Sequence, residues 1–289
     1  QFFGFPVVQA SLILNDPGDN SLYYILHNSI DVLPNSTQRP LNLFLSIVDM
    51  NADSGRGDII IKNNIIFNDT LAAGNLVACK HANGRDWWVV VPEFKQPGYY
   101  LFLVTPIGIQ FVRKQIIGQR LASDGQSCFN RQGTKYARYD ATNDFDVFDF
   151  DRCTGMLSNN IHVAINDSMF GFGVSFSPDG SKVYASSAQF LYQFDLNATN
   201  VAASMTTVAT WDSTYAPFAT YFFVQQLAPD NKIYIAAYNA SNVMHIIDSP
   251  DVLGVGCNVI QHGLQLPVLN DGTVPNHPNY HLGPLVGDR

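Results

Sequence analysis

One short string holds more potential chemistry than any other part of the sequence. His81, Arg85 and Asp86 lie close together, and Trp87 and Trp88 follow directly. A His–Asp pair could act as a general acid–base dyad, and an indole ring could stack on a sugar. Neighbouring residues of a strand point to opposite faces, so at most one tryptophan lines any given site. We expect the polar residues to stabilise a turn and one tryptophan to pack between neighbouring sheets, because no G-x-S-x-G or H-E-x-x-H motif accompanies them.

Acidic residues are dense between positions 144 and 151. Asp144, Asp146, Asp149 and Asp151 are interleaved with phenylalanine and valine. Carboxylate oxygens at this density could bind Ca²⁺. Strand alternation explains the same pattern without a ligand, because it places aspartate on a solvated face and phenylalanine in the core. We therefore expect an ordinary half-exposed strand here.

Other candidate metal ligands are weaker. Asp49 and Asp53 lie in a Gly-rich segment that could bind Ca²⁺, but no distal Glu completes a calcium loop, and we expect an ordinary turn. His277 and His281 are four residues apart, with a proline between them and no evident third ligand, so we expect a structural role for both. The sequence predicts no cofactor, with Ca²⁺ at Asp49 and Asp53 as the exception to test.

The cysteines do not form a metal or redox motif. Cys79, Cys128, Cys153 and Cys257 are scattered, without a C-x-x-C pair, which argues against a zinc ribbon or a thioredoxin-type site. Four cysteines allow three disulfide pairings. We favour Cys128–Cys153, since both lie in one repeat, and buried thiols are the alternative.

A repeated β-hairpin must position these residues. In the stretch 174–185, two runs with alternating apolar residues flank the turn Pro178-Asp179-Gly180. Similar turns recur, and their turn positions, at intervals of 66, 49, 47 and 51 residues, are Gly18, Gly84, Gly133, Gly180 and Asn231. One hairpin in every fifty or so residues predicts an all-β fold, a β-propeller of four-stranded blades.

Five blades and a remnant can be counted within a single propeller domain, 1–289. We place the blades at 1–70, 71–118, 119–165, 166–211 and 212–260, and a closing remnant at 261–289. Propellers usually have four to eight blades. We expect this chain to be part of a six- or seven-bladed ring that lacks an N-terminal portion, with a compact five- or six-bladed ring as the alternative. No long segment has an apolar period of 3.6, so little helix is expected.

Composition excludes some classes of partner. Of the 289 residues, 46% are hydrophobic and only 14% are charged, with a formal net charge of −8 and no basic run, so a nucleic-acid partner is not expected. No stretch of about eighteen apolar residues occurs, which argues against membrane insertion. Asn, Ser, Thr and Gln must supply the polar surface, as in extracellular β-proteins.

Four strings together resemble one protein family. They are the segments 80–88, 148–155, 174–180 and 275–284, of which the Asn-Gly-Arg-Asp-Trp-Trp, Asp-Arg-Cys-Thr-Gly and Pro-Asn-Tyr-His-Leu-Gly-Pro parts are the specific ones. The chain resembles secreted β-propeller domains of Bacteroidota cell-surface proteins. The resemblance implies an extracellular or cell-surface location and type IX secretion, although no C-terminal sorting domain is present here. It implies no catalytic residues.

The same resemblance implies that three short motifs in the sequence are acceptor sites for O-linked sugars. Thr70, Ser168 and Ser213 each follow Asp and precede Leu, Met or Thr, the acceptor pattern of O-glycosylation in Bacteroidota. All three lie in expected connections before or between blades. We expect them to carry sugars if the resemblance holds.

Two classes of function follow. We expect a non-enzymatic secreted surface protein, a scaffold or adhesion module that binds other protein chains or surface glycans in an extracellular assembly. The alternative is a glycan-binding module or a carbohydrate-active enzyme, which would need two carboxylates about 5–10 Å apart. The acidic residues that could be nominated are Asp86, Asp149, Asp179 and Asp230.

Overall fold

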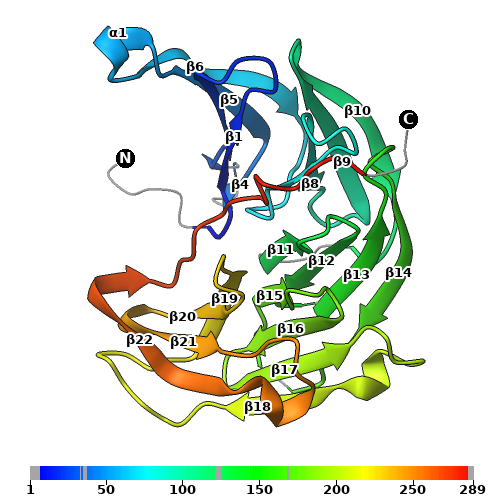
Figure 1. Cartoon of the computed structure of the whole chain (residues 1–289), viewed down its shortest axis with the longest axis vertical. Coiled ribbons are helices and arrows are strands. Elements are labelled where there is room, and N and C mark those ends of the chain that lie inside the picture. The colour runs from blue at the N-terminus through cyan, green and yellow to red at the C-terminus, as the bar shows by residue number, and fades with distance from the viewer. Residues whose placement is uncertain are drawn as a thin grey trace. The chain divides into compact units, whose positions relative to one another are not determined.

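The regular secondary structure of the protein is almost entirely β-strand. The computed structural model describes residues 7–32, 34, 38–120, 125–142, 144–167 and 169–285 (Figure 1). Among these residues the helical segments are three short turns, α1 (Ala52–Gly55), η1 (Ala202–Ser204) and η2 (Gly254–Cys257). None of the helices in the described part of the chain is long and apolar enough to cross a membrane. The expectation of little helix is confirmed.

Twenty strands form five four-stranded antiparallel sheets, the blades of a β-propeller fold. Strands that follow one another along the chain are neighbours in each sheet, and a two-stranded ribbon, β3 (Asp31–Val32) and β4 (Gln38–Arg39), interrupts the first one. The first blade contains β1 (Ser11–Asn15), β2 (Leu22–Asn28), β5 (Asn42–Asp49) and β6 (Asp58–Asn68). The second contains β7 (Val77–Lys80), β8 (Trp87–Pro92), β9 (Gly98–Thr105) and β10 (Gly108–Ile116).

The remaining three blades have the same order. The third contains β11 (Gly125–Phe129), β12 (Lys135–Asp140), β13 (Asp144–Phe150) and β14 (Leu157–Val163). The fourth contains β15 (Gly173–Phe176), β16 (Lys182–Ser187), β17 (Phe190–Asp195) and β18 (Thr206–Thr210). The fifth contains β19 (Phe222–Leu227), β20 (Ile233–Ala237), β21 (Ala240–Ile247) and β22 (Val259–Asp271). The predicted all-β propeller of four-stranded blades is therefore confirmed.

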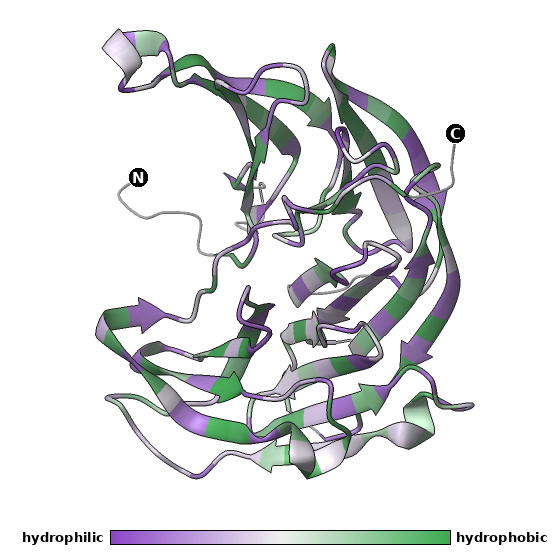
Figure 2. Cartoon of the chain, viewed as in Figure 1, coloured by the Kyte–Doolittle hydropathy of each residue, from purple (hydrophilic) through white to green (hydrophobic). Residues whose placement is uncertain are grey.

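The chain forms two compact units. The first comprises Gln1–Asp124, Phe150–Ser158 and Asn276–Arg289, and the second comprises Gly125–Asp149 and Asn159–Pro275. In Figure 2, hydrophobic and hydrophilic residues alternate along most strands, while the connecting loops are mostly hydrophilic or neutral. This alternation is what lets a blade bury a face against its neighbour.

The predicted turns share one geometry in four of the five blades. Gly84, Gly133, Gly180 and Asn231 all have φ between 67° and 74°. Each donates its backbone N–H, over 2.8–3.1 Å, to a carbonyl three residues earlier, that of His81, Asn130, Ser177 or Ala228. Asparagine tolerates this left-handed conformation better than most residues, which explains its presence in the fifth blade. Gly18 differs, since it lies outside the left-handed region and donates its N–H to the carboxylate of Asp16.

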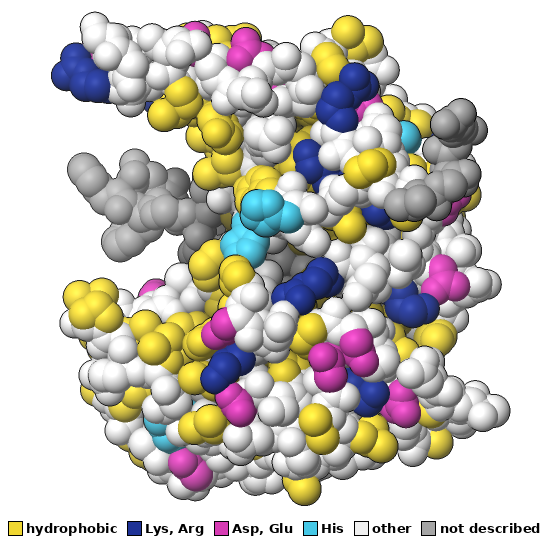
Figure 3. Space-filling model, viewed as in Figure 1, with side chains coloured by type: hydrophobic (Ala, Val, Ile, Leu, Met, Phe, Trp, Pro, Cys, Tyr) yellow, Lys and Arg dark blue, Asp and Glu magenta, His cyan; other side chains and the backbone are white. Residues whose placement is uncertain are grey.

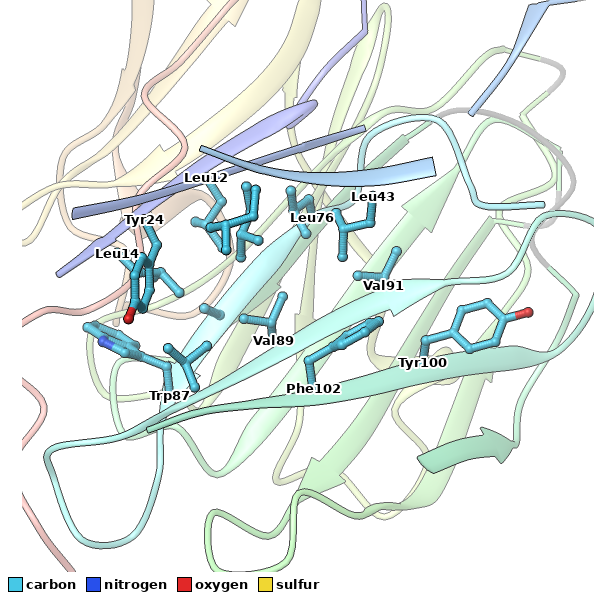
Figure 4. Packing of buried hydrophobic residues seen from close by; sticks show 14 of the residues in the cluster. Leu12, Leu14, Tyr24, Leu43, Leu76, Trp87, Val89, Val91, Tyr100 and Phe102 are labelled. Atoms are coloured by element: carbon cyan, nitrogen blue, oxygen red, sulfur yellow. The ribbon is translucent and has the colours of Figure 1, made fainter. Parts of the chain in front are cut away.

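The core of the first unit lies between the first two blades. Figure 4 shows Leu12, Leu14 and Tyr24 of the first blade facing Trp87 and Val89 of the second. All five side chains are at most 5% exposed. At about 25 cal/mol per Å² of buried apolar surface, such packing is the main force that holds two blades together.

In the second unit, the core between the third and fourth blades is rich in aromatic rings. Phe145 and Phe194 pack edge to face, with ring centroids 4.5 Å apart. Tyr139, Phe176 and Val183 complete this layer. The sheets are thus joined by the aromatic and β-branched residues that the alternating pattern assigned to the core.

The outer strands of the blades are irregular, and one of them moves a predicted blade boundary. The segments 58–62 and 65–67 belong to one continuous strand, β6, whose register shifts at several bulges. β14, the outer strand of the third blade, has few apolar residues in its sequence, Leu-Ser-Asn-Asn-Ile-His-Val, so alternation gives only a weak signal for it. The segment 264–268 lies in β22, so the fifth blade extends past the predicted limit at residue 260. A ring of six or seven blades stays a prediction.

Candidate functional site

The polar residues of the 80–88 string stabilise a turn, as expected. Asp86 accepts hydrogen bonds from Arg85 Nε at 2.7 Å and from Asn83 Nδ2 at 2.8 Å. His81 Nδ1 accepts the backbone N–H of Asn83 at 3.1 Å. Burial alone would raise the pKa of Asp86, but the bonds from Arg85 and Asn83 outweigh it and hold that pKa below its usual value. A carboxylate fixed in this way is poorly suited to accept a proton in catalysis.

Both tryptophans are buried, on opposite faces of β8. Trp87 is 0% exposed and donates its indole N–H to the carbonyl of Asn15 in the first blade. Trp88 is 3% exposed and donates to the carbonyl of Arg152 at 2.8 Å. The ammonium of Lys80 lies 3.6 Å from the centre of the Trp87 ring, and burial lowers the pKa of this lysine to about 8. Neither indole can stack on a sugar.

Arg152 joins three of the strings that carry the family resemblance. It is 3% exposed, and its guanidinium donates to the carbonyls of Lys80 at 2.8 Å and Gly283 at 2.6 Å. A Cβ added at Gly155 would lie 2.8 Å from the Trp88 ring, and one added at Gly84 would lie 2.4 Å from Pro284. The segment 80–88 and the parts 150–155 and 276–284 of the other two strings therefore meet inside the first unit, where they form a packed structural cluster.

The C-terminal segment crosses the first two blades and is held by side-chain bonds. Asn276 Nδ2 donates to the carbonyls of Ser11 at 2.7 Å and Leu76 at 2.9 Å. The Tyr280 hydroxyl donates to the carbonyl of Ile13 at 2.7 Å. His277 and His281 are both exposed. Within the described residues, no group of three or more His, Cys, Asp and Glu side chains could hold a metal ion.

The dense aspartates are more buried than expected. Asp146 is 1% exposed and lies 2.8 Å from the guanidinium of Arg138, itself 2% exposed. The prediction of a solvated face is wrong for Asp146, because the middle strands of the blade are covered on both sides. Asp149 forms an ion pair with Lys135 at 2.7 Å, and Asp151 accepts the N–H of Cys153 at 2.8 Å. The side chain of Asp144 lies outside the described residues.

The Asp49 and Asp53 carboxylates already have local donors. Asp49 accepts the backbone N–H of Asn51 at 2.8 Å. Asp53 forms an exposed ion pair with Arg56 at 2.8 Å. Both carboxylates thus stabilise the local turn, and Ca²⁺ binding by Asp49 and Asp53 stays a prediction.

The predicted modification sites fall in different places. Thr70 and Ser213 are exposed, in the connections that follow β6 and β18. Ser168 lies outside the described residues.

All four cysteines are thiols in the structure. Because Cys128 belongs to the second unit and Cys153 to the first, the pairing of these two stays a prediction.

A pocket of about 610 Å³ lies on the first blade. His27, whose ring stacks on Phe44 with centroids 5.1 Å apart, forms part of its wall, and Asn63 Oδ1 lies 3.2 Å from His27 Nε2. Among the described residues of the lining, Asp31 is the single acidic one, and it accepts the N–H of Leu41 at 2.9 Å. The pocket thus lacks the two carboxylates that glycoside hydrolysis needs.

Amides and hydroxyls, rather than acids, line the inner strands of the second unit. β11, β15 and β19 lie side by side at the inner ends of their sheets (Figure 1). Gln126 Nε2 donates to the carbonyl of Gln225 at 2.6 Å, and Ser175 Oγ donates to Gln225 Oε1 at 3.1 Å. Gln126 Oε1 in turn accepts the N–H groups of Val174 and Gln225. These buried polar atoms satisfy one another and stabilise the packing of three blades.

The acidic residues nominated for catalysis are engaged in their own turns or strands. Asp179 accepts bonds from Ser177 at 2.6 Å and Ser181 at 2.7 Å, and its pKa is lowered to about 2 because these bonds outweigh its burial. Asp230 accepts the hydroxyl of Tyr234 at 2.9 Å. None of the five first strands, which are all described, contains Asp or Glu. The two-carboxylate arrangement of a glycosidase is therefore not found on these strands.

Sequence analysis missed a cluster of aromatic side chains in three loops of the second unit, which we call the aromatic end. It comprises Phe170, Phe172, Trp211, Tyr215, Phe218 and Tyr238. The rings contact one another in two groups, with centroids 5.7 Å apart for Trp211–Tyr215 and 5.4 Å for Phe170–Tyr238, and Phe218 lies in the same loop as Tyr215. Tyr215 is 66% exposed, Phe218 54% and Phe170 39%. Rings this exposed contribute little to a core, and contiguous apolar surface commonly marks a binding site.

A polar network fixes the loop that carries Tyr215 and Phe218. The buried hydroxyl of Thr220 accepts the indole N–H of Trp211 at 3.0 Å and lies 2.9 Å from His262 Nε2. His262 Nδ1 lies 3.5 Å from a carboxylate oxygen of Asp212. The order hydroxyl, imidazole, carboxylate is that of a hydrolase triad. Thr220 is 0% exposed, however, so no substrate can reach its hydroxyl, and the network anchors the loop.

Comparison with known proteins supports the fold and goes no further. No family model and no curated protein matches the chain. A protein from Lactobacillus plantarum has a similar structure, with a TM-score of 0.54 and 12% identity over 86% of this chain and 70% of that one. A functionally unknown protein from Desulfotomaculum acetoxidans gives 0.51 and 11%, over 97% and 75%. Sqt1 from Chaetomium thermophilum gives 0.51 and 12%, over 92% and 64%. Identities this low indicate a shared fold alone.

Proposed function

We propose that the chain is a non-enzymatic β-propeller that serves as a scaffold or adhesion module in an extracellular assembly. One observation carries this proposal: the first strands of the blades contain no Asp or Glu, and those of the second unit carry amides and hydroxyls that bond one another. Catalysis needs groups that are free to change partners or protonation state. The polar groups found here are committed to holding blades together.

The surface composition agrees with an extracellular role. Only 14% of the residues are charged, and in Figure 3 the charged side chains are scattered among uncharged atoms. The resemblance to secreted domains of Bacteroidota surface proteins supports the same location. Thr70 and Ser213 are exposed, as acceptors of O-linked sugars must be. Other protein chains or surface glycans are the proposed partners.

Three measurements test the proposal. Purified protein incubated with a panel of polysaccharides and oligosaccharides, at several pH values and with or without Ca²⁺, should release no product. Turnover that is abolished by Asp179→Asn or Asp149→Asn would contradict it. Protease treatment of intact cells that produce the protein should degrade it if it lies on the surface. Intact-mass and peptide analysis of the native protein should reveal sugars at Thr70 or Ser213, and unmodified peptides across both would remove the glycosylation part.

A further inference from the structure

We propose that the aromatic end of the second unit binds a neutral glycan chain. This inference rests on the proposed function, since it assigns binding rather than turnover. Sugar rings present C–H bonds on one face and hydroxyls around the edge, so they pack on aromatic faces while nearby polar groups accept or donate hydrogen bonds. Exposed aromatic rings beside uncharged polar side chains are what such a ligand requires.

The two groups of rings come from distant segments, but a backbone hydrogen bond between Tyr238 and Tyr221 places these segments next to each other. Tyr238 contacts Phe170, and its backbone N–H donates to the carbonyl of Tyr221 at 2.9 Å. The Tyr221 ring lies 4.4 Å from that of Trp211, which in turn contacts Tyr215. Three loops are thereby joined side by side within one unit. A chain of several sugar residues could contact rings from more than one loop.

Charge at the aromatic end favours a neutral ligand. The segments 169–172, 211–221 and 238–242 contain no Lys, Arg or Glu, and their one charged residue is Asp212. That carboxylate accepts the N–H of Thr214 at 3.1 Å and faces His262. The exposed polar groups beside the rings include Thr214 and Asn239, which are uncharged. An anionic polysaccharide would find no cation in these segments to bind.

The same composition disfavours a protein partner at this site. Stable protein interfaces are enriched in Arg and Met as well as in aromatic residues. The three segments contain no Arg, and Met169 is their single Met. Their apolar surface comes mostly from aromatic rings and small residues, which is the composition that suits sugars better than an apolar protein patch.

The loop that carries the most exposed rings is fixed before any ligand arrives. Its base is closed by the hydrogen bond from Thr220 N to the Thr214 carbonyl, and Pro217 pairs with Ser241 at the start of β21. Trp211 N donates to the carbonyl of Gln189 at 2.8 Å, and the Thr220 hydroxyl holds the indole. A preorganised loop loses little conformational entropy on binding. The loop backbone that carries Tyr215 and Phe218 is thus fixed before a ligand binds.

Tryptophan fluorescence gives a local readout. The sequence has three tryptophans, and Trp87 and Trp88 are at most 3% exposed in the other unit. Trp211 lies against Tyr215, so a ligand on that ring should change the emission of Trp211. The probes are cellohexaose, xylohexaose, mannohexaose, maltohexaose and chitohexaose, with hexagalacturonate as the anionic comparison. Calorimetry measures the affinity in parallel.

Two ring variants and one control variant test whether the exposed rings themselves bind the sugar. Tyr215→Ala and Phe218→Ala each remove an exposed ring and should weaken binding by roughly threefold to tenfold, and together by more. Ile107→Ala, an 83% exposed apolar residue in the turn between β9 and β10, is the matched control and should leave affinity unchanged. Circular dichroism confirms that each variant is folded.

The outcomes are distinct. Saturable binding of at least one neutral hexasaccharide, weakened by the ring variants and not by the control, supports the proposal. Failure of all five neutral probes, equal binding by the double variant, preference for hexagalacturonate, or capture of a protein alone through these rings would overturn it. Chromatography of the same samples detects cleavage, which would refute the non-enzymatic function and leave the glycan site standing. Absence of both binding and cleavage would remove the site alone.

Discussion

The guanidinium of Arg152 donates a 2.6 Å hydrogen bond to the carbonyl of Gly283, although 131 positions separate the two residues. The same side chain also donates to the carbonyls of Lys80 and His81. One buried cation thus ties the turn after β13 to a turn of the second blade and to the C-terminal segment. The stability of the first unit should depend strongly on this single residue.

Replacing Arg152 should therefore be costly. Arg152→Met keeps much of the apolar stem but leaves three carbonyls without their donor, so we expect a loss of about 3 kcal/mol in the free energy of unfolding. Urea unfolding followed by tryptophan fluorescence measures the change, because Trp88 contacts this site. Arg56→Ala is the control, since this 75% exposed arginine forms only a surface ion pair and should cost about 0.5 kcal/mol or less. Equal effects of the two changes would refute the proposed role of Arg152.

Gly180 should tolerate no side chain. Its φ is +74°, and an added Cβ would lie 2.9 Å from Gln132 Oε1. Gly180→Val should destabilise the protein by about 1 kcal/mol or more, because a β-branched residue adopts this conformation only with strain. Gly283→Ala is the control, as nothing lies within 4 Å of its Cβ position and its φ is not in the left-handed region. Thermal melts compare the two, and an unchanged melting temperature for Gly180→Val would contradict the turn geometry.

The blades could be predicted from sequence because their signals are local. The turns at Gly84, Gly133 and Gly180 need a left-handed residue at a fixed place, and alternation assigns a core face to each flanking strand. The burial of Asp146 could not be predicted, because the alternation signal is local. Alternation separates two faces of a strand, but it cannot tell that the second face is also covered, here with Arg138 as an ionic partner.

The aromatic end could not be predicted, because it depends on contacts between distant loops. Phe170 and Tyr238 are neighbours in space and far apart in the chain. A weaker signal was present in Tyr215 and Phe218, two large rings in a connection between blades, where small polar residues are usual. Three of the four resemblance strings, in contrast, contribute to a packed cluster around Arg152, so their residues have a structural role there.

Acid should weaken the second unit through His245. Burial lowers the pKa of His245 to about 4, and the nearby His262 adds to this effect. The ordinary pKa in the unfolded chain is about 6.5, so between these values the unfolded chain binds a proton that the folded chain does not. The contribution is fully present above pH 6.5 and is lost as the pH falls toward 4, by up to about 3 kcal/mol.

A variant isolates this residue from the carboxylates that titrate nearby. His245→Gln should lower stability at pH 7.5, because the bond to the Thr220 carbonyl is disturbed, but should flatten the fall between pH 7 and pH 5. His281→Gln, an exposed histidine, should leave the slope unchanged. Urea midpoints at several pH values measure both. An unaltered slope in His245→Gln would show that other groups dominate.

Thiol reactivity should separate Cys153 from the other cysteines. Cys153 is exposed, whereas Cys79 and Cys257 are buried and Cys128 is half-buried. Burial raises the pKa of Cys79 to about 12 and also raises those of Cys128 and Cys257, which suppresses the reactive thiolate. Native protein should therefore react with Ellman's reagent at one fast thiol, absent in Cys153→Ser, and at all four in urea. If Cys128 and Cys153 instead form a disulfide, the fast thiol will be missing and only two will react in urea.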